Sequence, residues 1–175
     1  LREEVDYRVE ADNVKWFKDN VKLGGVTIPC VIDELSSKRV LTLEMLEGLH
    51  LSEWLATSPS QQQKNLVGQK LFDYFWYCTF ELRRINADLH PGNFLVLKDG
   101  DLGAIDFGCV RTLEQDFISA FVNLIPSLVD TLHNGRHPEQ LLKAYQSLKV
   151  ISEEVTLEQF KDEIQPSIEP FGRWL

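Results

Sequence analysis

The segment from residue 85 to residue 108 constrains the fold of this chain more than any other part of its sequence. Two short apolar runs, Phe94–Leu97 and Leu102–Ile105, flank a turn of sequence Lys-Asp-Gly-Asp. An Asp-Gly pair between two such runs is a strong hairpin signal, because glycine adopts the positive φ angle of a tight turn without steric cost. The pattern predicts a β-hairpin, preceded by a loop over Ile85 to Asn93.

Acidic and amide side chains lie on both sides of this hairpin. Asp88 and Asn93 stand five positions apart in the preceding loop, and Asp106 begins an Asp-Phe-Gly triplet directly after the second strand. Phosphoryl transfer needs such groups, since one carboxylate orients or deprotonates the acceptor while an amide and a second carboxylate hold the metal. The triplet alone is a weak signal, but the loop, hairpin and triplet in this order are specific. The alternative is structural: Asp88 caps a turn, Asn93 completes it and Asp106 ends a strand.

The sequence before this segment predicts one helix and a second hairpin. Apolar residues recur with a helical period from Arg2 to about Asn20. Two runs rich in β-branched residues, Val26 to Leu35 and Val40 to Leu46, are separated by Ser-Ser-Lys-Arg, which is a hairpin pattern. Three polar residues of the helix share one face at positions i, i+4 and i+7: Asp6, Glu10 and Asn13.

Helices are expected over most of the remaining chain. A short helix is predicted over His50 to Ala56, and a longer one from about Gln61 to Arg84. Apolar side chains follow a helical period in the longer helix, and we expect them to form core: Leu71, Phe72, Phe75, Trp76, Cys78 and Leu82. From about Glu114 onward the pattern is helical, with breaks near Asn134-Gly135, Pro138 and Pro166.

The composition argues against several classes of protein. The 175 residues are 43% hydrophobic and carry a formal net charge of -9. This charge repels phosphate backbones and anionic lipid surfaces, so we expect no nucleic-acid partner and no polybasic membrane contact. It is compatible with ATP, because a magnesium ion offsets the triphosphate charge and carboxylates hold the ion. The three cysteines form no Cys-x-x-Cys pair, which argues against a zinc knuckle or a disulfide framework.

Both ends suggest that the sequence is an excerpt of a longer protein. Residue 1 is not methionine, and the chain opens inside a charge-rich helical pattern. It stops in the aromatic stretch Phe171 to Leu175, which would favour burial. A processed mature chain is the alternative.

The loop and the triplet together resemble the active-site segment of the protein-kinase-like superfamily. The catalytic loop of that superfamily reads His-Arg-Asp-Leu-Lys-Pro-Glu-Asn, and Asp88 and Asn93 match its Asp and Asn. Two positions differ. Asn86 stands where the family has His, and His90 stands where protein kinases have the Lys that contacts the γ-phosphate. The second difference argues against phosphate transfer to protein substrates.

Two atypical branches of the superfamily carry Asp-x-His-Pro-Gly-Asn: the aminoglycoside/choline phosphotransferases and the UbiB/ADCK-like (ABC1-type) family. The opening helix favours the second branch, because Glu4-Val5-Asp6 followed by Glu10 resembles its Glu-x-Asp signature and the next helical turn. Val40 to Gly48 resembles its hinge. The resemblance covers about Leu1 to Val110, and in the aminoglycoside interpretation the Glu-x-Asp match would be accidental.

The resemblance implies roles for the catalytic segment. Asp88 would act on the phosphoryl acceptor, and Asn93 and Asp106 would bind Mg²⁺. Glu10 would pair with the ATP-binding lysine, which in this family lies upstream of the matching helix. Because neither that lysine nor the family's Lys-x-Gly-Gln segment is in this sequence, we expect the polypeptide alone to be inactive.

The resemblance also implies roles around the nucleotide. Glu4 and Asp6 would form the Glu-x-Asp element, which in this family meets the Lys-x-Gly-Gln helix over the pocket. Leu43 would be the gatekeeper, and the backbone of Glu44 and Leu46 would contact adenine. The alternative for the acidic residues of the opening helix is a solvated charged face.

The expected fold is α+β and protein-kinase-like. Residues 1–48 would be the C-terminal part of the small lobe, with the Glu-x-Asp helix and the hinge, and residues 49–175 the helical large lobe. The expected function is an ATP-dependent atypical kinase or ATPase, with ATP and Mg²⁺ as cofactors, that supports ubiquinone or related isoprenoid-lipid biosynthesis. Its partners would be an isoprenoid lipid or lipid-biosynthesis proteins.

The expected location is the cytoplasm or an organelle matrix, or the periphery of a membrane reached through regions outside this chain. Two other functions stay open at this point. One is a small-molecule phosphotransferase of the aminoglycoside/choline type, and the other is a pseudokinase that binds lipid or partners without turnover.

Overall fold

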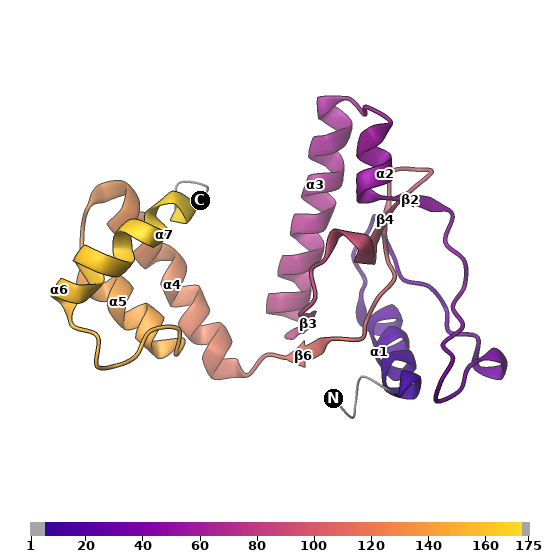
Figure 1. Ribbon diagram of the computed structural model, residues 1–175, viewed down its shortest axis with the longest axis horizontal. Coiled ribbons are helices and arrows are strands. Elements are labelled where there is room, and N and C mark those ends of the chain that lie inside the picture. Colours follow the sequence, from indigo (N-terminus) through magenta and orange to yellow (C-terminus); the bar gives the residue numbers. More distant parts are fainter. Residues whose placement is uncertain (1–5, 173–175) are drawn as a thin grey trace. The chain divides into compact units, whose positions relative to one another are not determined.

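The chain folds into two compact α+β and α-helical units, Leu1–Leu113 and Glu114–Leu175 (Figure 1). The computed structural model describes residues 6–172. The predicted boundary between the lobes, after residue 48, lies inside the first unit. It stays a prediction about the kinase lobes, since the compact units divide the chain at a different place.

A four-stranded sheet forms the centre of the first unit. Its order is β1 (Val26–Thr27), β5 (Leu102–Ala104), β4 (Phe94–Leu97) and β2 (Gly48–His50). Strands β4 and β5 are the predicted hairpin, and they pair antiparallel with Leu95 opposite Gly103. The turn between them has the expected glycine with a positive φ angle, at Gly100. The hairpin prediction is therefore confirmed, with β5 ending one residue earlier than expected.

A second, two-stranded ladder holds the two ends of the site segment together. Strand β3 (Arg84–Asn86) pairs antiparallel with β6 (Val110–Thr112), and Asn86 lies opposite Val110. The bond from Ala87 N to Cys109 O, at 2.7 Å, continues this pairing by one step. Everything between these residues, including the predicted catalytic loop and the Asp-Phe-Gly triplet, is thus closed into one loop by the ladder.

Helix α1 (Tyr7–Asn20) packs on the sheet through one face. It begins at Tyr7, later than the predicted start at Arg2, because Asp6 has an extended backbone and caps the helix by accepting a hydrogen bond from Arg8 N. Val14 and Phe17 on its inner face have no exposed surface. Leu1 to Val5, which include the predicted site residue Glu4, lie outside the described residues.

The second predicted hairpin, between residues 26 and 46, is only partly formed. Strand β1 pairs in parallel with β5, while the expected antiparallel pairing is reduced to isolated bridges, Val31 with Leu43 and Ser37 with Val40. The side chain of Ser36 explains part of the interruption. Its Oγ donates to Ile32 O and accepts from Thr42 N, so a side chain takes the place of backbone groups in the ladder.

Two helices follow the sheet's edge strand. Helix α2 (Leu51–Ala56) agrees with its predicted range, and α3 (Gln61–Trp76) begins with a capping box at Ser60. A π-helical turn follows at residues 77–81, and the backbone of Arg83 is left-handed, so the helix ends before the predicted Arg84.

The aromatic stripe of α3 is less buried than predicted. Tyr74 and Cys78 belong to the core, but Phe72 is 59% exposed and contacts Trp76 edge-on at the surface. Burial of the Cys78 side chain also raises the pKa of its thiol to about 12, which keeps this thiol protonated. The prediction of a fully buried stripe is therefore wrong for Phe72.

The second unit consists of helices around a separate core. Helix α4 (Gln115–Asn134) ends at Gly135, whose left-handed backbone forms the cap. Helices α5 (Pro138–Ser147), α6 (Leu157–Gln159) and α7 (Gln165–Gly172) follow. The predicted breaks near Asn134-Gly135 and Pro138 coincide with a helix end and a helix start, but the break near Pro166 is wrong, because a π-helical turn at residues 160–164 joins α6 to α7 without interruption. The fully buried members of this core are Leu141 and Phe160, joined by Leu124, Leu142 and Ala144.

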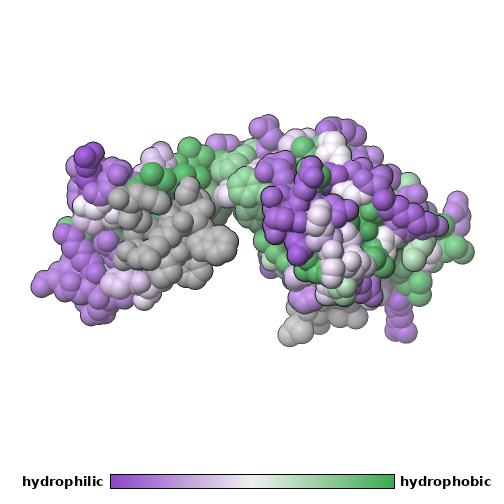
Figure 2. Space-filling model, turned by 90° about the horizontal axis from the view of Figure 1, so that it is seen from above, coloured by the Kyte–Doolittle hydropathy of each residue, from purple (hydrophilic) through white to green (hydrophobic). Residues whose placement is uncertain are grey.

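Surface character is mixed in the first unit. Hydrophilic residues predominate on its face in Figure 2, with hydrophobic residues scattered among them. Within residues 6–172, none of the helices combines the length and the apolar character that crossing a membrane requires.

Phe17 should contribute much more to stability than Phe72. Phe17→Ala is expected to lower the free energy of unfolding by about 3–5 kcal/mol, because it removes a fully buried ring and leaves a cavity. Phe72→Ala is the matched control, and its cost should stay within about 1 kcal/mol because that ring is largely exposed. Urea unfolding of both variants measures the difference, and equal costs would contradict the assigned core.

Candidate active site

The predicted catalytic loop is held in shape by its own polar groups. Asp88 Oδ1 accepts from His90 N at 3.2 Å, and His90 Nδ1 accepts from Gly92 N at 3.0 Å. Asn93 Nδ2 donates to Asp88 O at 3.1 Å, across the 3₁₀ turn formed by Pro91–Asn93. The structural interpretation holds in part: Asp88 accepts a hydrogen bond before the turn and Asn93 closes it, but His90 is the residue that caps the turn, and β5 ends at Ala104, before Asp106. The turn uses Asp88 Oδ1 and the Asn93 amide group, so Asp88 Oδ2 and Asn93 Oδ1 remain for a ligand.

Gly92 is needed because the His90 ring lies directly against it. A Cβ atom added at Gly92 would stand 2.9 Å from His90 Nδ1, closer than carbon and nitrogen can approach. The glycine of the Asp-x-His-Pro-Gly-Asn motif therefore allows the histidine to accept the backbone hydrogen bond.

Asp106 is hydrogen-bonded to β3 through its backbone carbonyl and to Gly108 through its side chain. Its carbonyl oxygen accepts from Asn86 Nδ2 at 2.8 Å, and its Oδ1 accepts from Gly108 N at 2.9 Å. The residue before it is linked to the catalytic loop, since Ile105 N donates to Asn93 O at 3.1 Å. The backbones of Asn93 and of the residue before Asp106 are therefore adjacent, and the shared metal site stays a prediction.

The residue after Asp106 anchors the triplet in the core. The Phe107 ring has no exposed surface and packs against the Phe17 ring of α1, with ring centroids 4.8 Å apart. Asn13 Nδ2, also from α1, donates to Phe107 O at 3.0 Å. Helix α1 and the Asp-Phe-Gly triplet are thus joined by a buried ring contact and a hydrogen bond.

Glu10 of α1 points toward the triplet. Its Oε1 is 3.5 Å from Phe107 N, and its Oε2 lies close to Gly108. Partial burial raises the pKa of the Glu10 carboxyl above its usual value, and the negative charge of Asp106 raises it further. The two carboxylates repel each other, so a cation placed between them would stabilise both.

An acidic cavity of about 450 Å³ collects four of the eight predicted site residues, and Asn93 is not among its lining residues. Four carboxylates line it, those of Asp6, Glu10, Asp88 and Asp106, and Arg111 supplies one positive charge. The Asp6 carboxylate is already paired with the Arg8 guanidinium, and this hydrogen bond lowers the pKa of the Asp6 carboxyl to about 2. The remaining lining residues are Tyr7, Val9, Asn13, Gly108, Cys109 and Val110.

The donor set formed by Asp106 in this cavity and by Asn93, whose backbone adjoins the same segment, fits magnesium. The Asp106 carboxylate and the Asn93 carboxamide oxygen are hard oxygen donors, and Mg²⁺ is commonly held by one or two protein ligands while waters and phosphates complete its shell. Within the described residues, no cluster of three or more His, Cys, Asp or Glu side chains forms a complete metal cage. The arrangement therefore suits a metal that arrives with a phosphate ligand better than a structural metal.

The predicted hinge residues do not line this cavity. The Glu44 side chain accepts from Cys30 N at 3.0 Å, and Glu44 N donates to Cys30 O at 2.8 Å. Leu46 lies over β5, where its Cδ1 would be 3.2 Å from a Cβ at Gly103. Because Glu44 N already donates to Cys30 O, the predicted adenine contact could use the carbonyl of Glu44 but not its N–H. The roles of Glu44, Leu46 and the gatekeeper Leu43 stay predictions.

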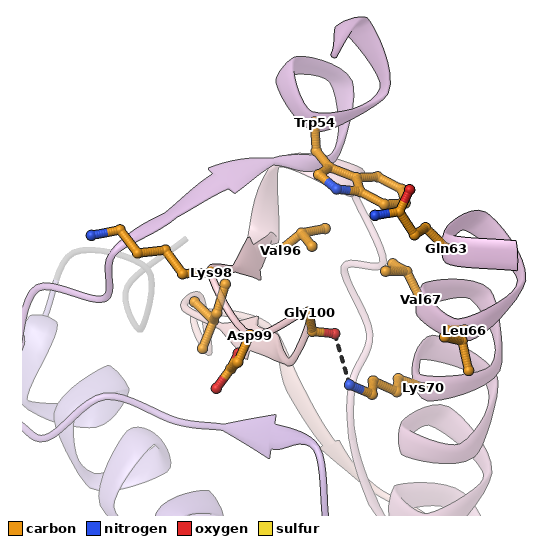
Figure 3. Close-up of a pocket in the computed structure, with 10 residues that line it drawn as sticks. Trp54, Gln63, Leu66, Val67, Lys70, Val96, Lys98, Asp99 and Gly100 are labelled. Atoms are coloured by element: carbon orange, nitrogen blue, oxygen red, sulfur yellow. Dashed lines mark hydrogen bonds between the residues drawn. The ribbon is translucent and has the colours of Figure 1, made fainter. Parts of the chain in front are cut away.

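A second hollow of about 280 Å³ lies between α2, α3 and the β4–β5 turn (Figure 3). Trp54, Val67 and Val96 give it an apolar lining, and Lys70 closes one side by donating to Gly100 O at 2.7 Å. The Lys70 ammonium also pairs with Asp101 at 2.7 Å, which fixes the turn. This hollow holds none of the predicted site residues.

Sequence reasoning missed the part that two buried asparagines play. Asn13 and Asn86 are 8% and 6% exposed, and each donates to the backbone of the triplet. A signal existed for both residues. Asn13 shares a helix face with Glu10, and Asn86 replaces the histidine of the kinase catalytic loop.

Comparison with known proteins decides between the two branches that share the loop motif. A model of the ABC1 atypical kinase-like domain matches residues 1–135. The chain belongs to this family. The resemblance to the UbiB/ADCK-like (ABC1-type) family is thereby confirmed.

Relatives and a solved structure support the assignment. The chloroplastic protein ACTIVITY OF BC1 COMPLEX KINASE 3 of Arabidopsis thaliana is 30% identical over 162 residues, which cover 87% of this chain and 21% of that protein. The mitochondrial atypical kinase coq-8 of Caenorhabditis elegans is 30% identical over 136 residues, covering 74% of this chain and 18% of that protein. The chain therefore spans about a fifth of the length of these relatives.

The fold agrees with that of a solved protein structure. The complex of Rv3197 with erythromycin from Mycobacterium tuberculosis superimposes with a TM-score of 0.70 at 25% sequence identity, covering 96% of this chain and 42% of that chain. The predicted α+β, kinase-like fold class is confirmed.

Removing the Glu10 charge should stabilise the protein above acidic pH. Because the folded-state pKa of Glu10 is raised, its contribution to stability is present below the unfolded-state pKa and is lost as the pH rises through the folded-state value. Glu10→Gln should therefore unfold at a higher temperature than the wild type at pH 7, and the difference should close by about pH 4. Thermal unfolding measured across this range tests the sign.

Glu34→Gln, at an exposed position, is the matched control for this test and should show no such pH-dependent gain. A Glu10→Gln variant that is less stable than the wild type at pH 7 would show that the carboxylate is stabilised in the folded state.

Proposed function

We propose that the full-length protein binds MgATP and transfers or hydrolyses its γ-phosphoryl group, with this chain supplying the catalytic and metal-binding side chains. The observation that carries the proposal is that Asp88 and Asp106 face one cavity. The backbone hydrogen bond from Ile105 N to Asn93 O supports the inclusion of Asn93, because it joins the catalytic loop to the segment that carries Asp106. Membership of an atypical kinase-like family supports the same chemistry.

Each residue has a distinct part in this proposal. Asp88 would orient the attacking hydroxyl or water and take up its proton, because its Oδ2 is not used by the turn that holds Oδ1. Asn93 and Asp106 would hold the metal. A bound magnesium ion would offset the negative charge of the phosphate groups. Glu10, whose ionised form is disfavoured beside Asp106, would be stabilised by a cationic partner such as the family's ATP-binding lysine.

The His90 side chain indicates which class of phosphoryl acceptor the site can use. It occupies the place of the lysine that contacts the γ-phosphate in protein kinases, and its Nδ1 is engaged by Gly92 N. Such a ring has one remaining nitrogen and no fixed positive charge, so it cannot replace the lysine fully. ATPase activity coupled to lipid or protein handling therefore fits better than phosphorylation of protein substrates.

The proposed biological role is support of ubiquinone or related isoprenoid-lipid biosynthesis. Its basis is the similarity to coq-8 and to other ABC1-type proteins, among which the names specify mitochondria and chloroplasts. An isoprenoid lipid or lipid-biosynthesis proteins would be the partners. The site of action would be an organelle matrix or the cytoplasm, at the periphery of a membrane.

Asp106→Asn in the full-length protein tests the chemistry. Losing the carboxylate removes a metal ligand but keeps the acceptor for Gly108 N, so Mg²⁺-dependent ATP turnover should fall by about a hundredfold or more while the fold is retained. Asp99→Asn, in the exposed β4–β5 turn, makes the same change of charge outside the cavity and should keep normal turnover.

Unchanged turnover of Asp106→Asn would remove this residue from the mechanism. A wild-type protein that ATP stabilises in the presence of Mg²⁺, with no measurable hydrolysis or transfer, would instead indicate a pseudokinase that binds nucleotide.

A further inference from the structure

Two buried asparagines hold consecutive carbonyl groups of the metal-binding loop. Asn86 Nδ2, from β3, donates to Asp106 O at 2.8 Å, and Asn13 Nδ2, from α1, donates to Phe107 O at 3.0 Å. The two residues are more than 70 positions apart in the sequence and meet the triplet at neighbouring peptide groups. We call Asn13 and Asn86 the asparagine pair.

The opposite atom of each carboxamide fixes its orientation. Asn86 Oδ1 accepts from Asp88 N at 3.0 Å, and Asn13 Oδ1 accepts from Arg84 Nη2 at 2.6 Å. A backbone N–H and a guanidinium can only donate, so each Oδ1 must face them and each Nδ2 must face the triplet. Arg84 is itself positioned, because its guanidinium lies 4.5 Å above the Trp16 ring.

The pair acts on the backbone of the triplet, which the burial of the Phe107 ring does not itself hydrogen-bond. The Phe107 ring is buried, which fixes its side chain but leaves the peptide groups on both sides of it to other contacts. The two Nδ2 atoms restrain those peptide groups by donating to Asp106 O and Phe107 O. Asn86 also binds Asp88 N, so a single side chain links the backbones of the catalytic loop and the metal-binding loop.

We propose that Asn13 and Asn86 are positioning residues that hold the Asp106–Phe107 backbone so that the Asp106 carboxylate faces the cavity beside Asp88 and Asn93. This inference rests on the proposed function for its effect on catalysis, but the backbone restraint itself does not depend on nucleotide. Asn13 acts through the Phe107 carbonyl, and Asn86 acts through the backbones of Asp106 and Asp88.

Replacing asparagine by aspartate tests the pair with little change of shape. Asn13→Asp and Asn86→Asp each keep the accepting oxygen and convert the donating nitrogen into an oxygen, which repels the carbonyl it faced. Asn13→Asp also keeps its contact with the Arg84 guanidinium, which favours folding of the variant. Asn65→Asp, on the exposed side of α3, is the control for the added charge.

The first measurement needs no nucleotide. Hydrogen–deuterium exchange of the peptide that contains Phe107 and Gly108 should be about tenfold faster in Asn13→Asp and Asn86→Asp of the full-length protein than in the wild type or in Asn65→Asp. Exchange that stays at the wild-type rate in both variants would overturn the inference, whatever the protein does with ATP.

The second measurement is the Mg²⁺ dependence of ATP turnover. Both variants should need about tenfold more Mg²⁺ for half-maximal rate, and Asn86→His, which restores a donor at this position, should recover part of the loss. A merely structural role would lower the amount of folded protein and leave the Mg²⁺ requirement unchanged, and that result would overturn the inference. Faster exchange in the variants of a protein whose wild type shows no turnover would support the backbone restraint and contradict the proposed function alone.

Discussion

The Phe107 ring packs against Phe17 with no surface left exposed, and the geometry of the site depends on this contact. Because the ring is fixed in the core beneath α1, the residue before it must lie at the core's edge, where Asp106 reaches the cavity. The same contact brings α1 alongside the triplet, which places Glu10 next to Gly108. The same core contact therefore sets the positions of both Asp106 and Glu10 in the site.

The electrostatics of the cavity follow from that arrangement. Packing α1 against the triplet brings Glu10 close to Asp106, and the resulting repulsion is a cost that the apolar contacts of Phe17 and Phe107 outweigh. Acidic groups that are kept close together without a matching number of basic groups favour a bound cation. Proteins commonly accept such local destabilisation at functional sites, where ligand binding relieves it.

The sequence was sufficient to predict the elements whose signals are local. The Asp-Gly turn identified the β4–β5 hairpin, and motif order identified the loop and the triplet that flank it. The resemblance also led to the correct family, because the motif extends over several elements. The pairing of residues 26–46 was mispredicted because β1 finds its partner in β5, some 75 residues away, and no local pattern contains that information.

Side-chain roles that depend on tertiary contacts were also out of reach of the sequence. Phe72 has the same hydrophobicity as the buried aromatic residues, and only the position of the sheet leaves it exposed. In the sequence, the asparagine pair is not distinguished from other polar residues. Its shared role arises because the fold brings α1 and β3 together at the triplet. The predicted roles of Asp88, Asn93 and Asp106 depend on a ligand, and their proximity supports those roles without testing them.

The central claim is that Asp106 and Asn93 hold a divalent cation in the cavity that Asp88 also faces. Anomalous diffraction from Mn²⁺ in crystals of the full-length protein with a non-hydrolysable ATP analogue tests it most directly. The account predicts a manganese peak within about 2.0–2.4 Å of an Asp106 carboxylate oxygen and of Asn93 Oδ1. A peak bound elsewhere, with neither side chain as a ligand, would contradict it.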